Sequence, residues 1–460
     1  MDAVYELADC IVNTRYEDIP PDAISVAKWS ILDTLGTTCA ASTAAPQCGG
    51  LVELIKESGG REESSIVAFG GKVPAWSAAF ANGALSHSLD YDDVHDEAGV
   101  HAGVGTVPAA FALAERVGGI NGKEFLTAVC LGADMLLRLA LASGRSRVTH
   151  WLRPQLHSNF GSVAACGKLL GLGQEQTADA WGIALAQAAG SIEPGAGVGT
   201  NIRGMWPAFP AKVGVLSALM AQRGVSGSKN SLEGRAGLFN AYFDGEYDRG
   251  LLTGELGKRF EIADSGFKPW PCCRANHPYI EATLDLVRDH GIQPGSIDEI
   301  TVFFAERIRM LCEPLEARRS PATSLDAKFS IPFSVAVAAA KKEVLIKDFT
   351  PDGLTDPAVL AVAARVVPVC DARVSVGQHS IPPAIVEIKT KQGQTHSRRI
   401  DVCLGHPAKP MTRDQLVQKF RECLSYSVKP VSDRDADEVI DMVENLEHVN
   451  DVGGIMRLLA

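Results

Sequence analysis

The chain has 460 residues, of which 46% are hydrophobic and 22% charged, so it is too apolar to be disordered and long enough for about two to four domains. Its 44 Lys and Arg residues against 55 Asp and Glu residues give a net charge of −11, which argues against nucleic-acid binding. The eleven cysteines contain no C-x-x-C motif, so we expect free thiols in a reducing compartment rather than a metal cluster.

The N-terminal residues are acidic and lack the positively charged start of a signal peptide. Apolar runs such as 104–114 are too short to span a bilayer. We therefore expect a cytoplasmic protein with no membrane partner.

Helical periodicity dominates roughly the first 265 residues. Ile24, Ala27, Ile31 and Leu35 recur at helical spacing within residues 22–41, after a Pro-Pro-Asp start signal. Further helices rich in Ala and Leu are expected at 75–85, 104–114, 123–143, 161–172, 175–190 and 210–223.

Strand signals appear only after about residue 265. Segment 298–305 is β-branched and aromatic, which predicts a strand. Segment 384–402 alternates apolar and polar residues on both sides of Gln392-Gly393, which predicts a hairpin. Helical patterns at 277–290 and 328–341 lie between these strands.

Helix returns after residue 412, where Thr412 with Gln415 forms a capping box and Ser432 with Asp435 starts a second helix. These helices resemble those of the first half. We therefore predict a mainly α protein: a large all-helical domain, residues 1–267 plus 405–460, with an inserted smaller α+β lid domain, residues 268–404. A ligand would bind in the cleft between them.

Residues 83–106 are the strongest candidate for a site. Four Asp, one Glu and three His fall between two apolar helices: Asp90, Asp92, Asp93, Asp96, Glu97, His87, His95 and His101. Charged side chains are rarely buried unless they are paired or used, so titratable groups between two core helices indicate a site. The alternative is a solvated acidic loop that happens to contain histidines.

Three basic stretches complement this acidic segment. They are Gly197–Arg203 followed by Lys212, Lys268–His277 with Arg274, and Ala327-Lys328-Phe-Ser330. The first is Gly-rich and would present backbone N–H groups to an anion, but it lacks the Gly-Lys-Ser/Thr ending of a P-loop. Taken singly, each Lys or Arg is more simply explained as a solvated surface charge.

Five motifs in the same order resemble the MmgE/PrpD family. They are Ser86–Asp93 followed by His101, Phe160–Leu172, Gly234–Phe239, Lys268–Arg274 followed by His277, and Ala327–Pro332. The resemblance covers nearly the whole chain. It implies homodimers and metal-free, cofactor-free chemistry on small polycarboxylates, by dehydratases, decarboxylases or epimerases.

The resemblance also implies roles for individual residues. Asp90 is similar to the first Asp of the family motif L-D-x-D-D, and His101 to the His that follows it. The implied catalytic residues are Asp90, His101, His157 and His277, and the implied substrate-binding residues are Arg203, Lys212, Lys268 and Arg274. The remaining histidines are expected to be structural.

Two positions depart from the family pattern. Val94 stands where relatives commonly have Thr, and Phe333 where the decarboxylase-like pattern has Tyr. Each loses a hydroxyl that would bind or protonate a substrate, which counts against decarboxylation.

We expect a metal-independent, 2-methylcitrate dehydratase-like lyase that abstracts a proton next to a carboxylate, with Asp90 and His101 as the base and acid. An epimerase of the iminodisuccinate type and a cis-aconitate decarboxylase are the alternatives. From other classes, a metal-dependent hydrolase would use Asp90, Asp92, Asp93, His95 and His101 as ligands. A tricarboxylate-binding protein without activity is the third possibility.

Overall fold

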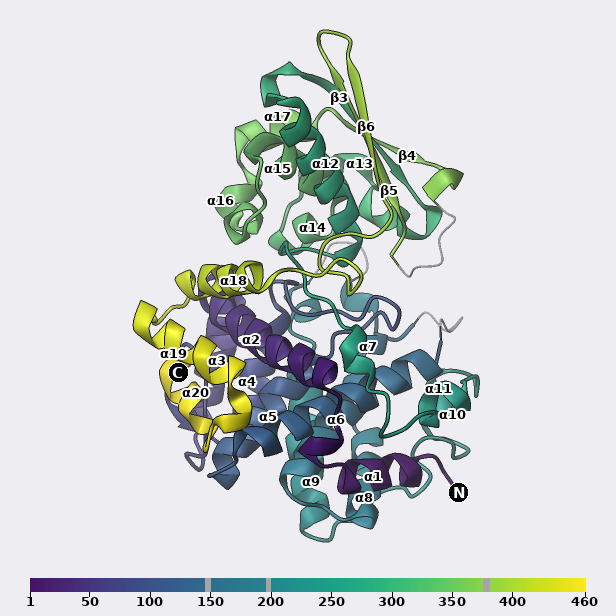
Figure 1. Ribbon diagram of the computed structural model, residues 1–460, viewed down its shortest axis with the longest axis vertical. Helices are drawn as coiled ribbons and strands as arrows, with labels where there is room; N and C mark the ends of the chain where they lie inside the picture. The colour runs from purple at the N-terminus through teal and green to yellow at the C-terminus, as the bar shows by residue number, and fades with distance from the viewer. Residues whose placement is uncertain (145–149, 196–199, 375–380) are drawn as a thin grey trace.

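The computed structural model describes all residues except 145–149, 196–199 and 375–380. The fold is mainly α, with a small mixed sheet at one end of the molecule (Figure 1). The helices of the first half are α1 (Val4–Asn13), α2 (Pro21–Ala44), α3 (Gln47–Glu57), α4 (Ala75–His87), α5 (Gly103–Val117), α6 (Gly122–Ala142), α7 (Arg153–Leu169), α8 (Gln174–Leu185), α9 (Ala208–Gln222), α10 (Leu238–Tyr242) and α11 (Arg249–Thr253).

The second half contains the sheet and the remaining helices. Its helices are α12 (His277–His290), α13 (Leu315–Arg319), α14 (Ser324–Lys328), α15 (Ile331–Lys341), α16 (Pro351–Leu354), α17 (Pro357–Ala363), α18 (Arg413–Ser425), α19 (Asp433–Glu444) and α20 (Gly453–Leu459). Two short strands of the first half, β1 (Ser64–Ser65) and β2 (Lys72–Val73), pair with each other. The strands of the second half are β3 (Ile297–Phe304), β4 (Val366–Cys370), β5 (Ala384–Thr390) and β6 (Thr395–Ile400).

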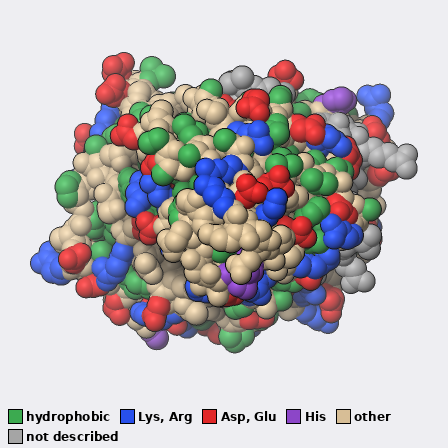
Figure 2. All heavy atoms as spheres, turned by 90° about the horizontal axis from the view of Figure 1, so that it is seen from above, with side chains coloured by type: hydrophobic (Ala, Val, Ile, Leu, Met, Phe, Trp, Pro, Cys, Tyr) green, Lys and Arg blue, Asp and Glu red, His purple; other side chains and the backbone are tan. Residues whose placement is uncertain are grey.

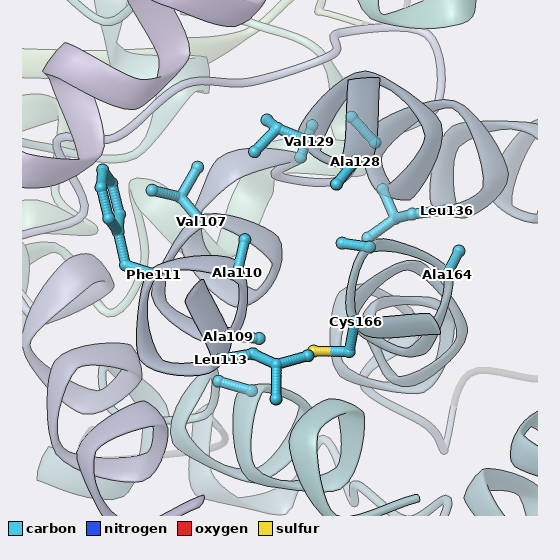
Figure 3. Packing of buried hydrophobic residues seen from close by; sticks show 14 of the residues in the cluster. Val107, Ala109, Ala110, Phe111, Leu113, Ala128, Val129, Leu136, Ala164 and Cys166 are labelled. Atoms are coloured by element: carbon cyan, nitrogen blue, oxygen red, sulfur yellow. The ribbon is translucent and has the colours of Figure 1, made fainter. Parts of the chain in front are cut away.

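Glycine and alanine allow the central helices to pack closely. A Cβ on Gly132 of α6 would lie 2.8 Å from the carbonyl of Gly161 on α7, and a Cβ on Gly161 would lie 2.6 Å from the carbonyl of Gly132. The two backbones therefore touch where any larger residue would separate them. Around this contact, Ala109, Ala110, Ala128, Ala164 and their neighbours fill the core with small side chains (Figure 3).

Buried residues form two large cores. The first joins residues from 3–262 with residues from 420–459, so that α18–α20 pack beside α2 and α5 (Figure 1). The second lies within residues 270–403. We call this second region, residues 268–404, the α+β part; its role as a separate lid domain stays a prediction.

The main sheet has the strand order β4-β3-β5-β6. The predicted strand at 298–305 and the hairpin at 384–402 are confirmed by β3 and by the antiparallel pair β5 and β6. Strand β4 was not predicted; it runs parallel to β3 at the edge of the sheet. Its Pro368 removes a backbone donor, which an edge strand tolerates.

The predicted helices of the first half are confirmed, but α7 begins at Arg153, eight residues before the predicted start at 161, and α8 ends at Leu185, five residues before the predicted end at 190. Helix α6 is long and apolar enough to cross a membrane by length and composition, but 94% of its apolar window is buried inside the protein. Its charged residues Asp134 and Arg138 are also buried, 2.8 Å apart. This helix therefore forms the centre of the helical core.

Figure 2 views the molecule from the end that carries the sheet. Lys and Arg side chains are interspersed with Asp and Glu over this face. Mixed charges of this kind do not form the continuous basic surface that a nucleic acid requires.

Candidate active site

The acidic segment between α4 and α5 is buried, so the alternative of a solvated loop is wrong. Asp90, Asp92, Asp93 and Asp96 each expose 7% of their surface or less. Asp90 has a φ of 51°, which turns the chain sharply after α4. Consecutive carboxylates therefore point to different partners.

Asp93 anchors the far end of this segment. Its carboxylate accepts hydrogen bonds from Gly103 N–H at the first turn of α5, at 3.0 and 3.1 Å, and from Ser30 Oγ at 2.7 Å. A carboxylate at a helix N-terminus satisfies free backbone donors and the helix dipole. Asp93 is thus a structural residue.

Asp92 is the centre of the site. Its Oδ1 lies 2.7 Å from His87 Nδ1, and its Oδ2 lies 2.7 Å from His101 Nδ1. His101 Nδ1 is also 2.7 Å from the Asp93 carbonyl. Because both neighbours of this nitrogen are acceptors, Nδ1 carries the proton and leaves His101 Nε2 available for chemistry.

The two imidazoles have opposite pKa shifts. Burial lowers the pKa of His87 below its ordinary value, against the attraction of Asp92. Burial also opposes the charged form of His101, but there Asp92 prevails and the pKa is raised. Although burial disfavours its charge, Asp92 keeps a pKa well below the ordinary value because His87, His101 and Lys268 face it.

This arrangement resembles known acid–base pairs. The two rings lie 4.6 Å apart around a single buried carboxylate. When two titratable groups have pKa values that are moved apart, one acts as the acid and the other as the base. His101 is therefore suited to donate a proton and neutral His87 to accept one.

Asp90 has a different partner. Its Oδ1 accepts a hydrogen bond from Lys268 Nζ at 2.6 Å, and its carbonyl accepts a second from the same ammonium at 2.9 Å. Burial opposes its charge, but Lys268 and His87 lower the pKa of Asp90. The sequence predicts Asp90 and His101 as base and acid, and their ligand atoms lie within 4.8 Å of each other. The hydrogen-bond partner of Asp90 is Lys268, whereas His101 contacts Asp92; the predicted catalytic roles stay predictions.

Lys419 on α18 contacts the backbone next to the Asp90–Lys268 pair. Its Nζ donates to the carbonyls of Tyr91 at 2.5 Å and Lys268 at 2.9 Å, and lies 2.5 Å from Asp33 Oδ1 on α2. One buried ammonium therefore fixes the backbone on both sides of the Asp90–Lys268 pair. The sequence contains no motif that marks Lys419.

Trp206 forms an aromatic wall of the site. Its ring centroid lies 5.3 Å from that of His87 and 6.4 Å from that of His101. The indole is buried, so this wall shields the imidazoles from water. Shielding of this kind strengthens the electrostatic interactions of the pair.

A cleft of about 660 Å³ lies beside the site, between the helical core and the α+β part. Its lining includes Ser88 after α4, Asn201 and Gly204, and Lys328 at the end of α14. Lys328 is 4% exposed, and its Nζ donates to the Ser88 carbonyl at 3.0 Å. Arg203, which adjoins the same cleft, is half-buried and lies 5.5 Å from the ring of Phe329.

Two of the predicted substrate-binding residues, Arg274 and Lys212, do not line this cleft. Arg274 is buried, and its Nε, Nη1 and Nη2 donate to Asp96 and to the Leu404 carbonyl. It therefore ties the acidic segment to the α+β part, and its predicted role in substrate binding stays a prediction. Lys212 is exposed on α9 and lies 5.9 Å from the ring of Phe80; within the described residues no contact joins it to the site.

His157 and His277 also have separate surroundings in the described part of the chain. His157 Nε2 lies 3.0 Å from Ser143 Oγ, and the ring stacks on Phe243. His277 Nε2 lies 3.2 Å from the Cys272 carbonyl. Burial lowers both pKa values well below the ordinary range, so both imidazoles are neutral. Their predicted catalytic roles stay predictions.

The ligand set predicted for a metal-dependent hydrolase is not assembled. Asp93 caps α5, and His95 lies near Glu261 and Asp264 rather than near His101. His87, Asp90 and His101 do place one ligand atom each within 4.8 Å of the others. However, the ammonium of Lys268 already contacts Asp90, so a cation there would be repelled.

The two positions that depart from the family pattern are both buried. Val94 N–H donates to the Gly266 carbonyl at 2.9 Å, and Gly266 N–H donates back to the Val94 carbonyl at 2.7 Å. Phe333 packs against Phe349 in the core of the α+β part. The predicted Gly-rich anion loop has its residues 197–199 outside the described part of the chain.

Comparison with known proteins identifies the family of this chain. The MmgE/PrpD N-terminal domain matches residues 5–249, and the MmgE/PrpD C-terminal domain matches residues 270–447. A cis-aconitate decarboxylase of Aspergillus terreus is 26% identical, covering 99% of this chain and 95% of its own length. The human cis-aconitate decarboxylase is 25% identical, covering 84% of this chain and 80% of its own. The two family domains together span most of the sequence, so the chain belongs to the MmgE/PrpD family.

Proposed function

We propose that the protein is a lyase that acts on a small di- or tricarboxylate by general acid–base catalysis. The observation that carries this proposal is the buried Asp92, which orients two imidazoles whose pKa values are shifted in opposite directions. Lys328 lines the cleft beside this site, where its ammonium would balance negative charge that develops on a substrate carboxylate, and Lys268 adds positive charge next to Asp90.

For dehydration, the base removes a proton from the carbon next to a carboxylate. The His87 imidazole is neutral, and its Nε2 lies 3.8 Å from Asp90 Oδ1. We therefore assign the role of base to His87 together with Asp90. The C–O bond then breaks, the electron pair of the C–H bond forms the double bond, and the His101 imidazolium gives the proton on its Nε2 to the leaving hydroxyl. Water is the second product.

Decarboxylation is the second candidate, favoured by the names of the relatives. There the C–C bond to a carboxylate breaks, carbon dioxide leaves, and His101 Nε2 protonates the resulting carbanion. The absence of hydroxyls at Val94 and Phe333 removes two groups that would assist this protonation. We therefore place dehydration first.

We propose further that the reaction requires neither metal nor cofactor, because Lys268 supplies the positive charge beside Asp90. The α+β part would act as a lid that brings Lys268 and Lys328 to the substrate. A homodimer in the cytoplasm remains our expectation for the assembled enzyme.

One experiment tests the proposed function. The protein is incubated in D2O with 2-methylcitrate, citrate, cis-aconitate or iminodisuccinate, and each acid is followed by NMR, with and without a chelator. Loss of water from a citrate supports dehydration, and loss of carbon dioxide supports decarboxylation. His101→Gln should abolish either reaction, whereas His290→Gln, on the exposed end of α12, should not. A wild-type protein that changes none of the four acids would contradict the proposal.

A further inference from the structure

Buried cations in this protein are paired with carboxylates, with one exception. Five Lys and Arg side chains are buried among the described residues. Four of them have a carboxylate oxygen within 3.0 Å: Arg138 with Asp134, Lys268 with Asp90, Arg274 with Asp96, and Lys419 with Asp33. Lys328 has none within the part of the chain that the structure describes. A buried charge without a counter-ion is costly, so this exception needs a reason.

The contacts of Lys328 leave most of its ammonium unused. An ammonium carries three N–H donors, and the described residues accept one of them, through the Ser88 carbonyl at 3.0 Å. The side chain lines the 660 Å³ cleft. Its remaining donors are therefore available to a molecule that enters the cleft.

The charged groups around Lys328 come from both sides of the cleft. Burial lowers the pKa of Lys328 to about 8, and Lys268 acts in the same direction, whereas Asp90 opposes them. The thiols of Cys48 and Cys272 also face it, but burial raises their pKa values and keeps them neutral. The carboxylate of Asp90 is already held by Lys268.

Arg203 provides a second cation at the same place. Its guanidinium lies over the ring of Phe329, the residue after Lys328, and its neighbours Asn201 and Gly204 line the cleft. Among the described residues it has no carboxylate partner. Two cations from different segments thus lie at one cleft, and neither forms an ion pair with a carboxylate among the described residues.

We infer that Lys328, flanked by Arg203, forms a carboxylate-binding subsite that holds the substrate carboxylate farthest from the reacting carbon. Lys328 has one carbonyl acceptor, and neither its ammonium nor the Arg203 guanidinium has a carboxylate partner among the described residues, so together they fit a carboxylate of a substrate that enters the cleft. This inference deepens the proposed function and rests on it for the identity of the ligand.

The test measures binding rather than turnover. The full-length protein, Lys328→Met and Lys328→Arg are titrated by calorimetry with tricarballylate and with its terminal monoamide. Because charged hydrogen bonds are strong, Lys328→Met should bind tricarballylate roughly 10- to 100-fold more weakly, and Lys328→Arg should recover part of this loss. The wild type should prefer the acid to the amide, whereas Lys328→Met should no longer distinguish them.

The charge-matched control is Lys391→Met, which removes one cation from the exposed turn between β5 and β6 and should bind like the wild type. Binding to the wild type should also weaken as the pH rises above about 8, where Lys328 loses its proton, and Lys328→Arg should remove this dependence.

The outcomes separate the subsite from the reaction. A folded Lys328→Met that binds tricarballylate as tightly as the wild type overturns the subsite, even if the enzyme converts an acid in the NMR assay. Binding that depends on Lys328, by a protein that converts none of the four acids, supports the subsite and contradicts the lyase. A wild type that binds neither compound overturns the subsite directly.

Discussion

Replacing Asp92 with Asn tests the carboxylate that the two imidazoles share. The amide keeps the size of the side chain, but its NH2 group cannot accept the hydrogen bond that one Nδ1–H group donates. If the NH2 group faces His87, that ring loses its acceptor; if it faces His101, the Nδ1–H of that ring keeps the Asp93 carbonyl at 2.7 Å but loses the negative charge beside it. Because Asp92 is fully buried, water cannot supply the missing acceptor.

The expected loss follows from these contacts. A hydrogen bond to a charged group contributes about 1.5–3 kcal/mol, and removal of a positioned acid or base costs roughly 10²–10⁴ in rate. We therefore expect kcat of Asp92→Asn to fall by about 10²- to 10⁴-fold. KM should change less than kcat, because the proposed function assigns the substrate carboxylates to Lys268 and Lys328 rather than to Asp92.

The pH profile supplies a signature that a merely structural role would not give. Asp92 is the group that raises the pKa of His101 against burial. In Asp92→Asn this pKa falls, so the general acid loses its proton at lower pH and the alkaline limb of kcat moves to lower pH. The assay is steady-state kinetics from pH 5 to 10 with the acid that the wild type converts.

Asp93→Asn is the matched control. The Asp93 carboxylate accepts from Ser30 and from the first turn of α5, and only its backbone carbonyl, which Asn keeps, faces His101 Nδ1. Asp93→Asn should lower the free energy of unfolding by about 0.5–2 kcal/mol, as loss of a helix cap does, without moving the alkaline limb of the kcat profile. A folded Asp92→Asn with kcat within threefold of the wild type and an unshifted profile would refute the reasoning.

Three further results are expected. Lys419→Met removes the hydrogen bond to the Lys268 carbonyl and should lower kcat more than it raises KM. An unchanged kcat would show that the contacts of Lys419 with the backbone are not needed for catalysis. Gly161→Ala should reduce the free energy of unfolding by about 1–3 kcal/mol, because its Cβ would meet the Gly132 carbonyl at 2.6 Å; chemical denaturation measures this loss, and an unaffected midpoint would contradict the packing. Because the folded pKa of Asp92 lies well below its ordinary value, its contribution to stability is present above the unfolded pKa and is lost as the pH falls through the folded one. Wild-type Tm should therefore drop on acidification more steeply than that of Asp92→Asn, and parallel curves would argue against it.

The sequence identified the acidic segment but not its internal pairing. Helical periodicity places His87 near the end of one helix and His101 before the next, and so locates the site. The partners depend on the left-handed turn at Asp90, which rotates Asp92 rather than Asp90 toward His101. An Asp adopts a positive φ more readily than most residues, but the sequence does not mark which Asp of the segment does so, so these contacts required coordinates.

The sequence alone also does not predict which lysines are buried at the site. Lys328 stands out in the sequence as a basic residue at a helix start, but only the structure shows that it is buried and lacks a carboxylate. Lys212 lies on the outer side of α9, next to the buried Ala211. Lys419 is one of many charged residues on a C-terminal helix, and its contacts with Tyr91 and Lys268 span more than 150 positions of sequence.

Strand β4 was missed for a local reason. β4 contains Pro368 and pairs in parallel with β3. Its sequence therefore lacks the alternation of apolar and polar residues that is typical of an antiparallel hairpin and that predicted β5 and β6. The long Ala-rich helices were found because burial on most faces leaves a strong apolar signal over many turns.

The most direct test of the account is a crystal structure with tricarballylate bound. We predict one carboxylate on Lys328, a second near Lys268, and a backbone carbon of the ligand about 3–3.5 Å from His101 Nε2 or His87 Nε2, as a reactive geometry requires. A ligand bound away from these imidazoles, or one whose carboxylates contact neither lysine, would contradict it.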